Sequence, residues 1–303
     1  MPDVIGVGHL CMDRIAFLPH FPEENRSVRI SSYIEMPGGT VSGALVQLSK
    51  LGIDTAFLSP VGDDESGRKL LDDMKSYGVD MSLCDIQSGK HSHFTNVMVN
   101  SENQSRTFQS FHSDFVSLPL NSDRKQYIRN AKILHLDNTR NEDALAAAKY
   151  AKKHNIPVSL DGSSISGDTE GLLKLVDILV CSEVFPERIT GVNGLEASML
   201  ELFKRFHPGI FVSTLGEKGS VILEGNETDY RFLYVPSCEV KAVDTTGAGD
   251  AYHGGFLYGL LKKKSFLECM RYGSACGAFC TLSPGRSSLA DARQMEEMMK
   301  KGI

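Results

Sequence analysis

Short apolar runs and longer segments with helical spacing alternate along most of the chain. Val4-Ile5-Gly6-Val7-Gly8 is an apolar run typical of a buried first strand, and the apolar positions in residues 42–51 recur with helical spacing. Gly52 ends that helix, and residues 55–59 form the next short apolar run. This order of strand, helix and strand predicts a mostly parallel sheet with helices on both faces.

The same alternation continues towards the C-terminus. Further strands are expected at residues 133–136, 157–160, 178–181 and 209–213. Helices are expected at residues 67–78, 142–154, 169–175 and 195–206, with two long helices after Gly247 and Ser265. Because no linker rich in Pro, Gly or Ser divides the chain, we expect residues 1–303 to form a single α/β domain.

Two stretches depart from this alternation of strands and helices. Polar and apolar residues alternate in residues 15–34 and 92–111, which predicts half-exposed antiparallel strands. We expect these strands, inserted at about residues 12–36 and 90–112, to form a small sheet that projects from the main sheet as a lid. An edge meander without motion is the alternative. The exposed strand edges of such a lid favour a homodimer that forms through it.

Composition and charge exclude several classes of protein. Of the 303 residues, 41% are hydrophobic and 23% are charged, close to the averages of soluble globular chains. The net charge is −6 and the longest basic run is Lys262-Lys263-Lys264, so nucleic acid and anionic membranes are poor partners. No apolar run approaches the roughly 20 residues of a membrane span. The seven cysteines form no Cys-x-x-Cys pair, which favours free thiols in a reducing cytoplasm.

Residues 244–256 carry the strongest chemical signal in the chain. They read DTTGAGDAYHGGF, a run of small residues that leads into a helix. The segment lacks the GxxxxGK[ST] pattern of the Walker loop, and Tyr252 stands where GxGxxG requires its third glycine. Gly247, Ala248 and Gly249 present backbone N–H groups at a helix start, where the helix dipole also favours an anion such as phosphate.

Asp250 follows directly in the same helix. A carboxylate at this position is stabilised as the anion and can accept a proton from an attacking hydroxyl group. An aspartate near the start of a helix is also a common cap, and the motif alone leaves both roles open.

Residues 244–256 resemble the second signature of the PfkB carbohydrate kinases, a family with the ribokinase-like α/β fold. Further segments resemble the family in order and spacing over nearly the whole chain. They are Gly8-His9-Leu10-Cys11-Met12-Asp13, Pro37-Gly38-Gly39, Val61-Gly62-Asp63-Asp64-Glu65-Ser66-Gly67, Ser182-Glu183 with Ile189-Thr190-Gly191, and Thr214-Leu215-Gly216-Glu217-Lys218-Gly219. The resemblance implies a kinase that uses ATP and Mg²⁺ to phosphorylate a primary hydroxyl of a sugar or sugar-like small molecule.

The resemblance also implies a role for each matching residue. The implied general base is Asp250, and the implied anion hole consists of Gly247, Ala248 and Gly249. The implied sugar-binding residues are Asp13, Gly38, Gly39 and Asp250. The implied ATP-binding residues are Ser182, Thr214, Gly216, Gly219, Gly247 and Gly249. The implied metal ligands are Glu183 for Mg²⁺ through water, and Asp244, Thr246 and Ser288 for a monovalent cation such as K⁺.

Departures from the family pattern bear on the substrate. Gly43 stands where an asparagine usually follows the Gly-Gly pair, and Ser182-Glu183-Val184-Phe185 replaces the usual Asn-x-x-Glu. At both positions the chain resembles a subgroup of the family that includes sulfofructose kinase. Arg140, in the segment after residue 136, is a further point of resemblance to this subgroup. Arg140 and Arg26, the latter on the lid, favour an acceptor that carries an acidic group. A catalytically silent sugar- or nucleoside-binding regulatory protein on the same fold is the alternative.

His91 and His93 lie two residues apart, on the same face of a predicted lid strand. Such a pair can ligate a metal ion when a third ligand is close. Because the sequence indicates no third ligand nearby, we expect these two histidines to belong to a polar face of the lid.

Overall fold

The computed structural model describes residues 1–103 and 105–300. Its main sheet runs from edge to edge through β14 (Tyr230–Val235), β13 (Ser220–Gly225), β12 (Ile210–Thr214), β11 (Ile178–Ser182), β10 (Val158–Gly162), β9 (Ile133–Leu136), β1 (Val4–Val7) and β4 (Thr55–Leu58). The strands from β12 to β4 are parallel, whereas β13 and β14 add an antiparallel edge. The predicted mostly parallel sheet is confirmed.

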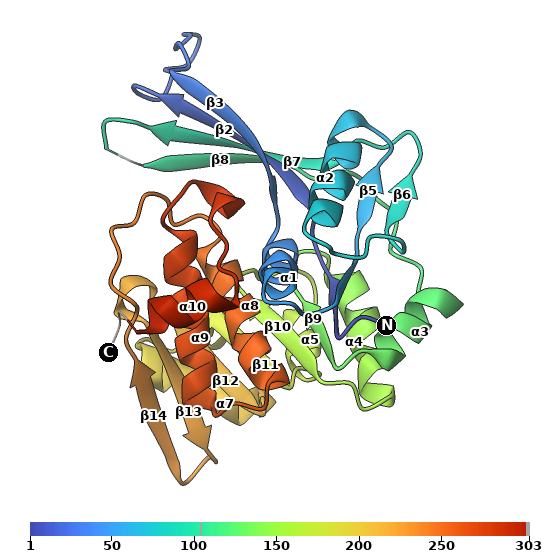
Figure 1. The fold of residues 1–303 in the computed structure, drawn as a ribbon, viewed down its shortest axis with the longest axis vertical. Coiled ribbons are helices and arrows are strands. Elements are labelled where there is room, and N and C mark those ends of the chain that lie inside the picture. Colours follow the sequence, from blue (N-terminus) through green and yellow to red (C-terminus); the bar gives the residue numbers. More distant parts are fainter. Residues whose placement is uncertain (104, 301–303) are drawn as a thin grey trace.

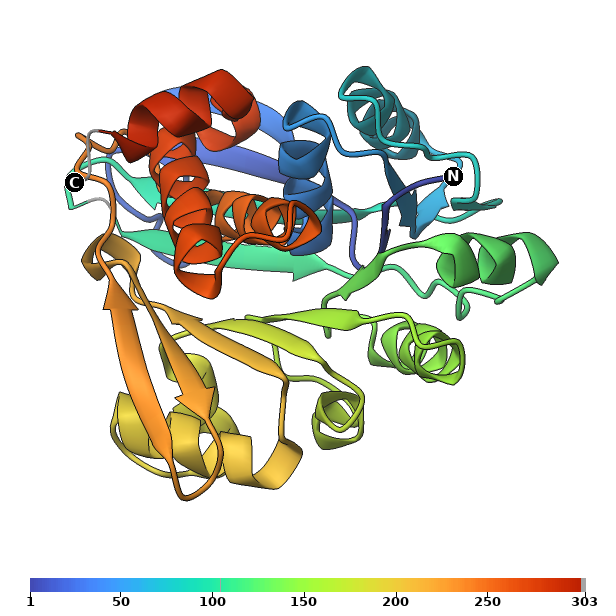
Figure 2. The same cartoon turned by 60° about the horizontal axis from the view of Figure 1, so that its bottom comes forward.

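Helices cover both faces of this sheet (Figure 2). One face carries α1 (Thr40–Lys50), α2 (Glu65–Ser76), α8 (Ala248–Leu261), α9 (Phe266–Cys280) and α10 (Ala292–Met299). The other face carries α3 (Ser122–Asn130), α4 (Asn141–Lys153), α5 (Thr169–Leu173), α6 (Val184–Thr190) and α7 (Leu195–Phe206). Val4 and Ile5 of β1 belong to the two opposite cores, because successive side chains of a strand point to opposite faces. Within the described residues, none of the helices has the length and apolar character needed to cross a bilayer.

A second, smaller sheet projects above the main body (Figure 1). It has the order β3 (Ser32–Gly38), β2 (Cys11–Leu18), β7 (His93–Asn100) and β8 (Arg106–Phe111), and we call it the lid sheet. Its outer pairs are antiparallel, and the central pair of β2 and β7 runs parallel. The chain between β2 and β7 passes through α1, β4 and α2, a long crossover of the kind that parallel pairing requires. Beside it, β5 (Pro60–Gly62) and β6 (Asp85–Gln87) form a short parallel pair.

Glycines allow α1 and α8 to pack closely against each other. A Cβ added at Gly254 of α8 would lie 2.6 Å from Gln47 Cβ and 2.9 Å from the Ala44 carbonyl oxygen, both in α1. The buried Tyr252 hydroxyl lies 2.8 Å from the hydroxyl of Ser220, which ties α8 to β13 of the main sheet. These contacts fix the start of α8 relative to the start of α1.

Candidate active site

Asp250 lies in the first turn of α8 and faces α1. A Cβ added at Gly43 of α1 would lie 2.6 Å from both Asp250 Cβ and Asp250 Oδ2. The Asp250 side chain therefore occupies the space beside position 43 of α1. Gly247, the N-cap of α8, has a φ of 80°, which glycine adopts without strain.

The residues predicted to bind a sugar surround the start of α1. Gly39 is the N-cap of α1, and a Cβ at this position would lie 2.2 Å from the His9 carbonyl oxygen. A Cβ at Gly38 would lie 2.3 Å from Asp13 Oδ2. The geometry thus brings Asp13, Gly38 and Gly39 into contact, one helical turn from Gly43 and Asp250. Their roles stay predictions.

Asp137 is a site residue that the sequence analysis missed. It follows the C-terminal end of β9 and is only 1% exposed. Its Oδ2 accepts a hydrogen bond from the backbone N–H of His9 at 2.9 Å, and its Oδ1 accepts one from the backbone N–H of Thr139 at 2.8 Å. Burial raises the pKa of the Asp137 carboxyl above its usual value. The signal available in the sequence was an aspartate directly after a buried strand, where parallel strands place functional side chains.

A cavity of about 900 Å³ lies beside the glycine-rich start of α8. Thr214, Gly216 and Gly219 line it together with Ala248 and Gly249. A side chain at Gly249 would meet no described heavy atom within 4 Å, so the backbone there is open to the cavity. The predicted ATP-binding residues of segment 214–219 therefore line the same cavity as the predicted anion hole at the start of α8.

Ser182 and Glu183 lie at the end of β11, next to this cavity. Ser182 is the register partner of Thr214, and Glu183 follows it as the exposed N-cap of α6. An exposed carboxylate with access to water is a donor that suits Mg²⁺. The exposed carboxylate of Glu183 at this edge of the cavity therefore suits the Mg²⁺ ion that the family resemblance implies.

Asp244 connects the segment before α8 with the loop after α9. Its Oδ1 accepts hydrogen bonds from the backbone N–H and the hydroxyl of Thr246, at 3.0 and 2.8 Å. Its Oδ2 accepts one from the backbone N–H of Gly285 at 3.0 Å. Ser288, the third predicted cation ligand, donates to the hydroxyl of Ser283 in the same loop. The two segments that contain the predicted cation ligands, residues 244–246 and 283–288, thus meet.

Arg106, at the start of the lid strand β8, also contacts Asp244 and Thr246. The sequence analysis did not identify it as a site residue. Its guanidinium donates to Asp244 Oδ1 and to the Thr246 hydroxyl, each at 3.2 Å. Burial opposes ionisation of Asp244, but the hydrogen bonds from Thr246 and Gly285 and the charge of Arg106 hold the pKa of its carboxyl below the usual value. One lid strand is therefore linked directly to the segment that precedes the predicted anion hole.

Comparison with known proteins identifies the family of this chain. A family model described as pfkB family carbohydrate kinase matches residues 1–293. The chain belongs to this family. It is 28% identical over 294 residues to a ribokinase of Haemophilus influenzae, and the match covers 95% of both chains. The solved structure of Arabidopsis thaliana ribokinase complexed with ribose and ATP superposes with a TM-score of 0.88, at 23% identity and over 99% of both chains.

Relatives of this pfkB-family kinase are named for different acceptors. A 5-dehydro-2-deoxygluconokinase of Bacillus subtilis is 26% identical, over 98% of this chain and 96% of its own. That identity is close to the value for the ribokinase, so similarity alone leaves the acceptor of this kinase open.

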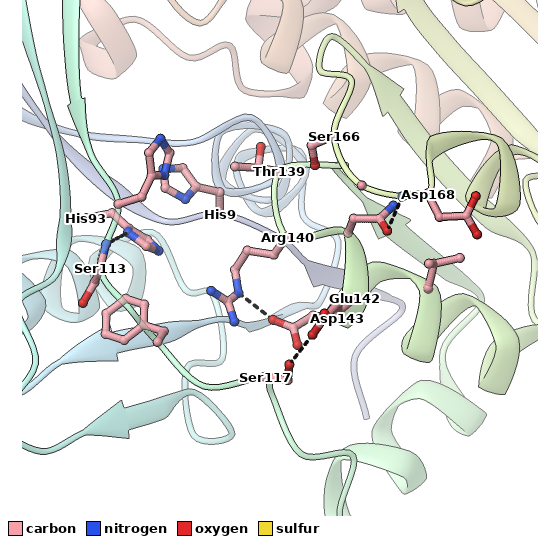
Figure 3. A pocket seen from close by; sticks show the side chains of 15 residues that line it. His9, His93, Ser113, Ser117, Thr139, Arg140, Glu142, Asp143, Ser166 and Asp168 are labelled. Atoms are coloured by element: carbon pink, nitrogen blue, oxygen red, sulfur yellow. Dashed lines mark hydrogen bonds and ion pairs between the residues drawn. The ribbon is translucent and has the colours of Figure 1, made fainter.

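The structure does not bring Arg26 and Arg140 together. Arg140 lines a cavity of about 670 Å³ near the end of β9, where its Nε donates to Asp143 Oδ2 (Figure 3). Arg26 lines another cavity, of about 410 Å³, with Tyr33 on the lid face opposite to that of Asp13. The expectation that both arginines hold one acidic group is therefore wrong for a single chain.

The structure also separates His91 from His93. His91 is exposed, with Nδ1 at 3.6 Å from Asp64 Oδ2, whereas His93 is buried. Two other histidines, His9 and His112, lie beside His93. The expectation that no third histidine is near was wrong, because these residues lie 84 and 19 positions away in the sequence. Only the packing of the lid on the end of β1 brings them together.

We expect Gly43→Ala to lower turnover while the fold is retained. The new methyl group needs the space of the Asp250 carboxyl, and a displacement of about 1 Å can cost a reaction about 10²-fold. Overpacking between α1 and α8 costs about 1–3 kcal/mol, which the better helix propensity of alanine, about 1 kcal/mol, offsets only in part. Steady-state kinetics and a thermal melt measure the two effects, with Gly209→Ala as a remote control. Unchanged turnover would contradict the contact between Gly43 and Asp250.

Proposed function

We propose that this protein transfers the γ-phosphoryl group of ATP to a primary hydroxyl group of a sugar or sugar-like molecule, with Asp250 as the general base. The position of Asp250 carries this proposal. Its side chain faces Gly43 and the helix start where Asp13 and Gly39 lie, whereas Ala248 and Gly249 of the same turn line the cavity of about 900 Å³. One helix start therefore faces both proposed reactants.

Each part of this helix start has a task in the transfer. Asp250 accepts the proton of the acceptor hydroxyl. At the same time the oxygen of that hydroxyl bonds to the γ-phosphorus, and the bond between this phosphorus and the leaving ADP oxygen breaks. The N–H groups of Gly247, Ala248 and Gly249 stabilise the charge on the transferred group. Phosphoryl transfer requires little covalent help from a protein, so positioning and charge stabilisation supply most of the acceleration.

The remaining residues hold the reactants. Asp13 can accept hydrogen bonds from two neighbouring sugar hydroxyls, while Gly38 and Gly39 allow the backbone to approach the sugar. On the other side, the ATP-binding residues are proposed to be Ser182, Thr214, Gly216 and Gly219. Glu183 would hold Mg²⁺ through water, and the bound ion neutralises phosphate charge. Asp244, Thr246 and Ser288 are proposed to contribute to a site for a monovalent cation.

We further propose that two copies associate through the outer face of the lid sheet. Ile30, Tyr33 and Phe111 are large apolar residues that are 49%, 53% and 40% exposed on the lid. Tyr33 lies across from Ala16, and Ala16 from Met98, so these three side chains share one face. A second lid sheet would cover this face and its strand edges. A cytoplasmic location stays a prediction.

We expect Asp250→Asn to lower turnover by about 10²-fold or more, the usual contribution of a general base. Asparagine is similar in size but cannot take up the proton, so ATP binding and the melting temperature should change little. An assay of ADP formation with a panel of sugars measures turnover, and calorimetry measures ATP binding. Near-normal turnover in the folded variant would remove Asp250 from the mechanism.

We expect activity to fall when K⁺ is replaced by tetramethylammonium at equal ionic strength, and to fall further in Arg106→Met. In the parent protein Arg106 already places a positive charge against Asp244. Without it, the carboxylate keeps its hydrogen bonds from Thr246 and Gly285, and a bound cation is the proposed source of its opposite charge. Initial rates over a K⁺ titration test this, with Arg29→Met as a control on the exposed part of the lid. If neither protein responds to K⁺, the proposed cation site is only a turn.

We expect the double variant Ile30→Glu with Tyr33→Glu to be a monomer, because four like charges would face each other in the proposed dimer. Light scattering in solution measures the mass of the parent and the variant. Tyr234→Glu, at a residue that is also 53% exposed but lies on the distant strand β14, is the matched control. A monomeric parent protein would refute the lid interface.

A further inference from the structure

Three histidines from separate segments meet beneath one end of the lid sheet. His9 follows β1, His93 begins β7 and His112 follows β8. Their ring centroids are 4.5 Å apart for His9 and His93, and 5.5 and 5.6 Å from each of these to His112. They line the cavity of about 670 Å³ that also contains Arg140 and Phe115 (Figure 3). The proposed phosphoryl transfer uses none of the three imidazole rings.

Two nitrogens of this cluster are buried without a hydrogen-bond partner in the part of the chain that the structure describes. They are His9 Nδ1 and His93 Nε2. His93 Nδ1 accepts a hydrogen bond from the backbone N–H of Ser113 at 2.8 Å, so the neutral ring carries its proton on Nε2. His93, only 3% exposed, therefore presents an unpaired N–H donor at the cavity. Buried donors are almost always paired, so a group outside the chain, a water molecule or a ligand, supplies the acceptor.

A metal ion does not fit this tautomer. One ligand atom of each histidine lies within 4.8 Å of the others, which is close enough to consider a zinc site. Binding through His93 Nε2 would require its lone pair, and the ring proton would then move to Nδ1. There it would face the N–H of Ser113, so that two donors would oppose each other. The geometry favours a ligand that accepts a hydrogen bond.

The charges around the cavity disfavour an anion. Burial lowers the pKa of His9 to about 3 and that of His93 to about 4, with the neighbouring histidines and Arg140 acting in the same direction. Both rings are therefore neutral at pH 7. The charged residues that line the cavity are Arg140, Glu142, Asp143 and Asp168. Asp143 pairs with Arg140, which leaves two carboxylates and no unpaired positive charge among these four residues.

Hydroxyl groups suit this mixture of donors and acceptors. Each hydroxyl donates one hydrogen bond and accepts others, so it can pair with the N–H of His93 and with a carboxylate such as that of Glu142. Phe115 adds an apolar surface, with its ring centroid 4.7 Å from that of His93. A sugar ring combines hydroxyls at its edge with apolar C–H faces. The chemistry of the cavity therefore matches a neutral, hydroxyl-rich ring.

The cavity adjoins the proposed sugar site at His9. The backbone N–H of His9 donates to Asp137, and its carbonyl oxygen lies against Gly39 at the start of α1. The ring of the same residue lines the cavity. A ligand that extends past His9 would contact both places at once.

We propose that the three-histidine cavity is a second subsite, which binds a neutral sugar ring attached to the one that is phosphorylated. This inference rests on the proposed kinase function. It assigns as acceptor a disaccharide or a glycoside, larger than a free pentose. His93 is the residue that determines this specificity, through its Nε2–H.

The acceptor range tests the proposal first. ADP formation is compared for D-ribose, D-glucose and D-fructose, for the disaccharides maltose, isomaltulose and sucrose, and for the acidic gluconate and fructose 6-phosphate. We expect kcat/KM for at least one disaccharide to exceed that of its own monosaccharides by about tenfold, equivalent to about 1.4 kcal/mol. A preference for a monosaccharide or for an acidic acceptor would overturn the subsite.

Two substitutions of His93 separate its N–H donor from its structural role. In His93→Asn the side-chain oxygen can still accept from Ser113, but the donor at the Nε2 position is lost. His93→Gln can restore an amide N–H near that position. We expect the asparagine variant to raise KM for the preferred disaccharide about tenfold, with kcat and the kinetics of monosaccharides unchanged, and the glutamine variant to restore part of the loss.

Melting temperatures confirm that both variants fold. Equal losses on monosaccharides and disaccharides, or no loss at all, would contradict the subsite. If no sugar supports ADP formation, the proposed kinase function fails by itself. Calorimetric titration of the parent and His93→Asn with the three disaccharides then decides on the subsite, since weaker binding to the variant supports it and equal or absent binding refutes it.

Discussion

The close contact between α1 and the start of α8 is the constraint on which the proposed site depends. Gly43 and Gly254 have no side chains, so the two helices approach until Asp250 lies against α1 and Gln47 against α8. A larger residue at either position would have to displace these neighbours. The proposed general base and the proposed sugar-binding turn come from segments about 200 residues apart in the sequence, and this packing sets the distance between them.

Buried polar groups fix the other side of the site. Asp137 is held by donors from the loop after β1 and from its own loop, and it also lies 3.4 Å from the hydroxyl of Thr40 in α1. Because a buried carboxylate is stable only when it is well hydrogen-bonded, these segments cannot separate without a large loss of stability. Asp244, which is half-buried, links the loops around the proposed anion hole, and Arg106 of the lid also binds it. The lid is therefore linked to both halves of the proposed site.

Periodicity predicted the parallel core well, since buried strands and amphipathic helices each leave a local signature. It missed the antiparallel strands β13 and β14, although each contains a short apolar run, Val221-Ile222-Leu223 and Phe232-Leu233-Tyr234-Val235. It also missed α3, a polar helix in which only Arg124 and Ile128 are buried. A helix with so few buried positions has a weak apolar pattern.

The sequence by itself determined the α/β class, the glycine-rich helix start and Asp250 within it, because these depend on residues that are neighbours in the chain. It could not determine that Arg106 meets Asp244, that Arg26 and Arg140 face different cavities, or that His9 and His112 flank His93. Those relations depend on which strand faces point inward and on where the lid crosses the main sheet. Only the tertiary structure decides them, because hydrophobic patterning specifies which residues are buried and leaves open which distant segments meet.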